Sequence, residues 1–107
     1  MPLTVVGLPS AVIAINATDS NAVGALDDAL SISIFAPSSL TGTVNLEVEP
    51  SSTGTAFVVQ QSGGSDVTIP ANKATTIANP SFRQFRLVSG SAEAASRTFT
   101  VTKTILT

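Results

Sequence analysis

The chain has 107 residues, of which 43% are hydrophobic and only 11% are charged, and its net charge at pH 7 is −2. This length suits one domain, residues 1–107, that buries about 65% of its unfolded surface. Five scattered basic residues form no phosphate-binding surface, so we expect no nucleic acid partner. No run of about 18 apolar residues could span a bilayer, so we expect no membrane association. The lack of cysteine excludes disulfides and cysteine-ligated metals.

Short runs of alternating apolar and polar residues, separated by turns rich in Gly, Pro, Asn and Ser, predict an all-β fold. A single antiparallel β-sandwich of jelly-roll type, with about eight or nine strands, fits this spacing. In chain order, we expect strands at residues 3–6, 11–16, 30–36, 43–49, 56–61, 66–69, 74–78, 82–89 and 97–105.

Two stretches near the N-terminus leave alternatives open. Residues 1–10 either form a strand of their own sheet or, if they do not, form an arm that adds to the sheet edge of a neighbouring subunit. In residues 19–31, Asp19 or Ser20 could cap a short helix, although Gly24 disfavours it. The other interpretation of residues 19–31 is a loop that runs into a strand.

The two-residue period of a strand assigns side chains to faces. In the strand at 43–49, Asn45, Glu47 and Glu49 should point outward. Members of the inner layer should include Val44, Leu46, Val48, Phe57, Val59, Val67, Ile69, Phe99, Val101 and Ile105. Lys103 shares the inward phase, so we expect it near the sheet's end, where its ammonium reaches water. Phe82 is out of phase with Phe85 and should lie either on the turn after Pro80 or beyond a bulge, in both cases pointing to the core.

The C-terminal region predicts a row of hydroxyls. The segment "GSAEAAS" at 90–96 reads as the loop of a hairpin that joins the last two strands as antiparallel neighbours. Thr98, Thr100, Thr102 and Thr104 then form the outer row of the final strand, a position that favours β-branched residues. With 14 Ser and 14 Thr in the chain, we expect a surface of hydroxyls rather than charges. Such a surface resists self-association poorly, which favours a protein that works packed against a partner.

The chain offers little for catalysis, since it contains no His, Cys, Trp or Tyr. Glu47 and Glu49 should lie about 6.5–7 Å apart on one strand face, a spacing that glycosidases use, but an exposed Glu-x-Glu is also an ordinary solvated face. Asp27 and Asp28 could offer oxygens to calcium, but their spacing fits no known loop. We therefore expect no enzyme, no catalytic residue, no cofactor and no metal.

Three of the five basic residues, Arg83, Arg86 and Arg97, belong to the C-terminal part. They either form ion pairs with Glu47, Glu49, Asp66 or Glu93 across strands, or line a contact surface, where arginine is enriched. Both interpretations stay open at this stage. The residues we expect at an interface are Leu3, Val5, Val6, Arg83, Arg86, Arg97, Thr98, Thr100 and Thr102.

Three stretches within residues 31–103 carry a resemblance: "FAPSSLTGTVNLEVEPSSTGTAF", "VTIPANKATTI" and "SFRQFRLVSGSAEAASRTFTV". This text resembles small β-sandwich virion proteins of tailed bacteriophages, which are jelly-roll or discoidin-like domains in capsid decoration proteins and in necks and tails. The resemblance covers about two thirds of the chain and brings no catalytic residue.

The resemblance implies a non-enzymatic structural protein of the virion, assembled in the host cytoplasm. The N-terminal sequence lacks the basic region and clear cleavage site of a signal peptide, so we expect no export through a secretion pathway. We expect a capsid decoration or cement protein that contacts the major capsid protein or other virion proteins and forms a homo-oligomer. A neck or tail component is the first alternative. A carbohydrate-binding module on the virion surface is the second, but sugar-binding faces normally use Trp or Tyr, which this chain lacks.

Overall fold

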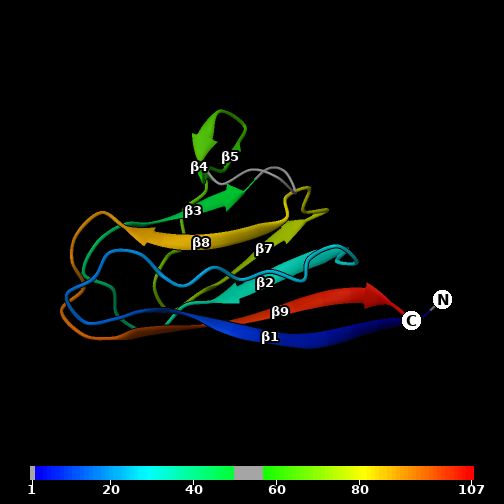
Figure 1. Ribbon diagram of the computed structural model, residues 1–107, viewed down its shortest axis with the longest axis horizontal. Helices are drawn as coiled ribbons and strands as arrows, with labels where there is room; N and C mark the ends of the chain where they lie inside the picture. Colours follow the sequence, from blue (N-terminus) through cyan, green and yellow to red (C-terminus); the bar gives the residue numbers. More distant parts are fainter. Residues whose placement is uncertain (1, 50–56) are drawn as a thin grey trace.

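The computed structural model describes residues 2–49 and 57–107. These residues form β-strands joined by turns and loops, and the described ranges contain no helix (Figure 1). The strands are β1 (Leu3–Ile13), β2 (Ser31–Phe35), β3 (Val44–Glu49), β4 (Val58–Val59), β5 (Gln61–Ser62), β6 (Ser65–Asp66), β7 (Ala74–Ala78), β8 (Gln84–Ser89) and β9 (Arg97–Leu106).

The strands form two main antiparallel sheets and a small hairpin. The first sheet has the order β1-β9-β2-β7, the second has the order β4-β3-β8, and β5 pairs with β6. Residues 19–23 extend the second sheet beyond β8, through bridges from Asp19 to Val88 and from Val23 to Phe85. Figure 1 shows the start of β1 and the end of β9 side by side at one end of the first sheet.

The chain alternates between the two sheets. It passes from β1 in the first sheet to residues 19–23 in the second, returns to β2, crosses to β3 and β4, and then visits β7, β8 and β9 in alternating sheets. A double-sheet arrangement with this order of visits is a jelly roll. The expectation of an all-β, antiparallel sandwich of jelly-roll type is confirmed.

The core lies between the two sheets and follows the alternation of the sequence. Along β3 and β8 every second side chain is buried, and the inward residues of β1, β2 and β9 meet them. The buried apolar side chains of these strands are Ala11, Ile13, Ile32, Ile34, Val44, Leu46, Val48, Phe85, Leu87, Phe99 and Val101. Phe82 precedes β8, is buried and packs edge-on against Phe85 with ring centroids 6.5 Å apart, as predicted.

The N-terminal part differs from the expectation of two separate strands. Leu3–Ile13 is one strand, because a bulge between Leu8 and Ala11 absorbs the extra residue and accommodates Pro9, which has no N–H to donate. This strand pairs with β9 of its own chain, so the condition for an N-terminal arm is not met. Residues 19–30 contain no helix, and the loop interpretation is confirmed.

The prediction that a hairpin joins the last two strands is wrong. β8 belongs to the second sheet and β9 to the first, so residues 90–96 cross between sheets instead of joining neighbours. Alternating strand patterns alone do not tell a hairpin from a crossover, because either connection leaves the inward residues in phase. Phe57 and Val59 are also misplaced by the sequence: Val59 lies opposite Glu47 on the outward side of β3, and Phe57 is only half-buried.

Candidate contact surface

The outward side of the first sheet carries no charged side chain. Residues that lie opposite each other in an antiparallel ladder share a face, and one such row runs from Gly7 through Thr102 and Ser33 to Thr76. We call this side the uncharged face. Its members are Leu3, Val5, Gly7, Val12, Ser31, Ser33, Phe35, Ala74, Thr76, Ala78, Thr98, Thr100, Thr102, Thr104 and Leu106.

Apolar and hydroxyl side chains share the uncharged face. Its five large apolar members, Leu3, Val5, Val12, Phe35 and Leu106, are between 38% and 67% exposed. The hydroxyls of Ser33 and Thr76 bond to each other at 2.9 Å. From strand spacing the face is about 30 Å long along β1 and β9, and it is four strands, about 15 Å, wide over the shorter length of β2 and β7.

The outward side of the second sheet is charged instead. Arg86 lies opposite Glu47 and bonds to its carboxylate at 2.8 Å, while Asp19 lies 3.7 Å from the same guanidinium. The Arg86 guanidinium also stacks over the Phe57 ring, 4.5 Å from its centroid. The two outer faces of the sandwich therefore differ in chemistry, and a partner that avoids charge would meet only the first sheet.

The expected interface residues fall into two groups. Leu3, Val5, Thr98, Thr100 and Thr102 lie together on the uncharged face, whereas Val6 points to the inner side of β1 and is half-buried.

The three arginines lie elsewhere, in ion pairs. Arg83 bonds to Glu49 at 2.8 Å, Arg86 to Glu47, and Arg97 to Glu93 at 2.9 Å. These contacts support the ion-pair interpretation of the arginines.

Glu49 is buried, although its strand phase predicted an outward position. It lies at the end of β3, where Gln84 and Arg83 cover it with hydrogen bonds of 2.7 and 2.8 Å. These bonds, led by the one from Gln84, lower the pKa of the Glu49 carboxyl. Glu47 and Glu49 therefore each bond to a different arginine, as the ion-pair interpretation predicts.

The expectation that the Lys103 ammonium reaches water is wrong. It is buried, and its Nζ donates to the Ala25 carbonyl at 2.7 Å and to the Asp28 carboxylate at 2.6 Å. The hydrogen bond from Lys103 lowers the pKa of Asp28. A shallow pocket of about 340 Å³ opens beside these groups and Asp27. The described residues contain no group of three or more His, Cys, Asp or Glu side chains placed to hold a metal ion.

Glu93 was expected only as a possible ion-pair partner of an arginine, and the sequence did not predict its burial or its other bonds. It sits in the 90–96 crossover with no exposed surface, and its carboxylate accepts bonds from the Thr41 and Gly42 N–H groups, the Ser89 hydroxyl and Arg97. Burial alone raises the pKa of Glu93, but these four donors outweigh burial and lower the pKa to about 2. Glu93 thus fastens the crossover to the loop before β3. The one signal in the sequence is a lone acid inside "SAEAAS".

Gly42 sits against this crossover and leaves no room for a side chain. A Cβ at Gly42 would lie 2.5 Å from the Ser89 Oγ and 2.7 Å from the Ser91 nitrogen. We expect Gly42→Ala to lower the free energy of unfolding by about 1–3 kcal/mol, because the added Cβ would push the crossover away from Gly42 and weaken the bond between the Gly42 N–H and Glu93. Gly24→Ala is the control, since its Cβ would meet only the Gln84 side chain, at 3.9 Å. Urea denaturation compares the two variants, and equal effects would contradict this account.

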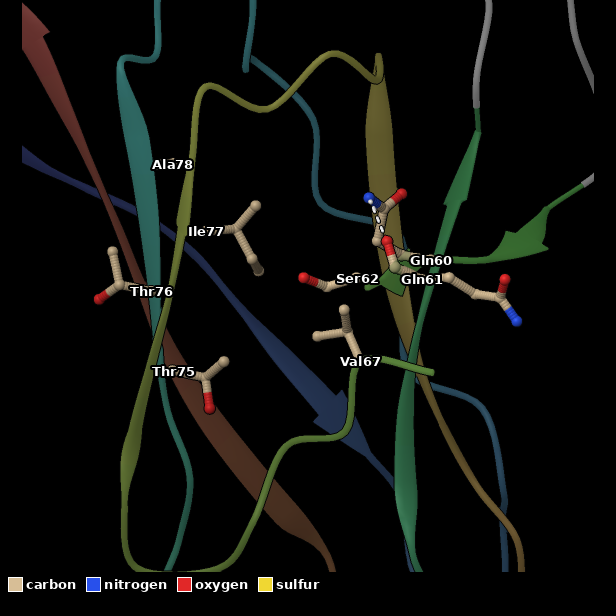
Figure 2. Close-up of a pocket in the computed structure, with 8 residues that line it drawn as sticks. All are labelled: Gln60, Gln61, Ser62, Val67, Thr75, Thr76, Ile77 and Ala78. Atoms are coloured by element: carbon tan, nitrogen blue, oxygen red, sulfur yellow. Dashed lines mark hydrogen bonds between the residues drawn. The ribbon is translucent and has the colours of Figure 1, made fainter. Parts of the chain in front are cut away.

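A groove of about 410 Å³ lies between β7 and the segment around β5 (Figure 2). Thr75 and Ile77 point from β7 toward Val67 and Ser62, while Thr76 points to the opposite side, where it joins the uncharged face. The groove is lined by Gln60, Gln61, Ser62, Val67, Thr75, Thr76, Ile77 and Ala78. This lining has amides and hydroxyls but no aromatic ring on which a sugar could stack.

Comparison with known proteins adds no assignment. No protein-family model, curated protein or solved structure in these comparisons matches the chain. In the described ranges no helix has the length and apolar character needed to cross a membrane.

Proposed function

We propose that this protein is a non-enzymatic structural component of a tailed-phage virion, acting as a capsid decoration or cement protein. The observation that carries the proposal is the uncharged face. An outer sheet surface about 30 Å long with no charge and five exposed apolar side chains favours burial against another protein. The resemblance of residues 31–103 to phage β-sandwich proteins supplies the class of partner, which is the major capsid protein or another virion protein.

The rest of the molecule suits a role based on contact. The carboxylates of Glu47, Glu49 and Glu93 are held by arginines, and the buried Lys103 is held by Asp28. Groups engaged in this way stabilise a rigid sandwich rather than perform acid–base chemistry. A rigid subunit with one face for its partner and an opposite, charged face for solvent is suited to repeated placement on a symmetric particle.

The test is the copy number of the protein in purified virions, measured by quantitative mass spectrometry against the major capsid protein. Hundreds of copies per particle would support capsid decoration. A dozen copies or fewer would move the protein to the neck or tail, where the same face would contact a ring component. Absence from the virion would overturn the proposal.

A further inference from the structure

The C-terminal half of the β1 edge is closed by the chain itself. The Asn21 side chain accepts a bond from the Val12 N–H at 2.8 Å and donates one to the Ser10 carbonyl at 3.0 Å, so its amide replaces a neighbouring strand. The bridge from Ile13 to Ser20 continues this closure. An edge that would otherwise attract another strand is blocked along residues 10–13.

The N-terminal half of the same edge is open. The Thr107 N–H donates to the Pro2 carbonyl at 3.1 Å, so these two residues form a hydrogen-bonded pair of the β1–β9 ladder. Hydrogen-bonded pairs alternate along an antiparallel ladder, so Leu3, Val5 and Gly7 direct their N–H and C=O groups away from β9. In the described part of the chain no strand or side chain meets these groups.

Pro2 on one side, and Pro9 with its bulge on the other, bound the open edge, but within these bounds the edge lacks the features with which proteins block edge pairing. Residues 3–8, "LTVVGL", contain no charge and no proline. Unpaired backbone groups in this arrangement are a template for pairing with an extended chain, and a second copy offers one of matching length. Because neither copy has a charge there, no repulsion between side chains opposes the approach.

The edge is also complementary to itself. When two copies of β1 run antiparallel about a two-fold axis at Val5, each Val5 faces the other, and Leu3 faces Gly7 of the second copy. All six outward N–H groups then find a carbonyl, because the outward residues of one strand meet the outward residues of the other. Gly7 has no heavy atom within 4 Å of the place where a Cβ would stand, which leaves room for the leucine opposite.

We propose that two copies of the chain pair through β1 in this register and join their first sheets into one continuous eight-stranded sheet. The dimer doubles the uncharged face and presents it on one side. This inference goes beyond the proposed function and holds for the isolated protein. The paired segment is only about 17–23 Å long, so it buries less than the roughly 800 Å² per partner of a standard interface. A micromolar dissociation constant is therefore expected, and a particle surface that holds both copies strengthens it.

Cysteine cross-linking tests the register, because the natural chain has no cysteine. A hydrogen-bonded antiparallel pair places its Cα atoms about 5.5 Å apart, within the range of a disulfide. We expect Val5→Cys to form disulfide dimers under mild oxidation at least tenfold faster than Val12→Cys, an exposed control on the same strand whose edge Asn21 covers. Equal rates would overturn the proposal.

Charged substitutions at Val5 test whether the two-fold axis passes through this residue, and sedimentation velocity measures the oligomeric state. The wild-type protein should dimerise at tens of micromolar, whereas Val5→Lys and Val5→Glu should each stay monomeric, because like charges face each other across the axis. An equimolar mixture of the two variants should restore the dimer.

Val5 is 67% exposed, so both variants should fold, which circular dichroism checks. A wild-type protein that is monomeric up to about 1 mM, or a mixture that stays monomeric, would overturn the pairing. Since no particle takes part, a failure here leaves the virion copy number as an independent test.

Discussion

Replacing Glu93 by Gln should lower the free energy of unfolding by about 3 kcal/mol, the largest stability effect expected for an exchange so close in shape. The glutamine NH₂ group would replace one acceptor oxygen and face donors from Thr41, Gly42 or Ser89. Arg97, whose side chain is only 16% exposed, would lose its carboxylate. Leaving a buried group without a hydrogen-bond partner lowers the free energy of unfolding far more than breaking an exposed ion pair does.

Chemical denaturation followed by circular dichroism measures this effect. Glu47→Gln is the matched control, because it breaks an ion pair with Arg86 whose guanidinium side chain is 32% exposed. We expect the control to lose less than about 1 kcal/mol. If the two variants were equally stable, the account of Glu93 as the anchor of the crossover would be wrong.

The same carboxylate predicts how stability depends on pH. The pKa of Glu93 lies at about 2 in the folded protein and near 4.5 in the unfolded chain. The unfolded chain therefore binds the proton first, and stability is present above pH 4.5 and is lost as the pH falls from 4.5 toward 2. We expect a loss of about 2–3 kcal/mol over this window, and a smaller loss in Glu93→Gln, measured by denaturation at stepped pH. A wild-type protein with no greater loss than the variant would contradict the assignment.

Placing one charge on the uncharged face should abolish attachment to the particle and leave the fold unchanged. Thr100 is exposed on β9 and lies opposite Phe35. Under the proposed function, Thr100→Glu would bury a carboxylate without a partner against the capsid. Such a charge costs about 2–5 kcal/mol, so the number of bound copies should fall at least tenfold.

Thr68→Glu is the control, because Thr68 is also an exposed threonine but lies beside Asn45 on the charged second sheet. Both variants should keep their unfolding midpoints, as exposed substitutions usually do. Binding is measured by adding each variant to particles that lack the protein and counting bound copies by mass spectrometry. If Thr100→Glu binds as well as Thr68→Glu, the uncharged face is not the contact surface.

The two faces of the strands could be read from the sequence because strand alternation is local. Thr98, Thr100 and Thr102 were predicted on the outer row of the last strand, and they lie there. The assignment failed where a strand ends or lies at a sheet edge: Glu49 became buried under Arg83 and Gln84, and Val59 became exposed. Burial at such positions depends on what the rest of the chain lays over them.

The sequence predicted only some of the residues of the uncharged face. Leu3, Val5 and the threonines were named, but Phe35 and the outward side of β7 were not, because their place beside β9 follows from sheet order. The arginines were grouped with the surface because arginine is enriched at protein interfaces. In the fold they lie on the other sheet or at a strand end, each beside a glutamate.

By itself the sequence determined the all-β class, the alternating core and the scarcity of charge, because these depend on composition and on a two-residue period that each strand carries within itself. Only the tertiary structure decided that the last two strands lie in different sheets, that Glu93 closes the crossover between them, and that half of the β1 edge is left open. Each of these depends on contacts between residues far apart in the chain. No local pattern encodes such contacts, since they arise only when the two sheets pack together.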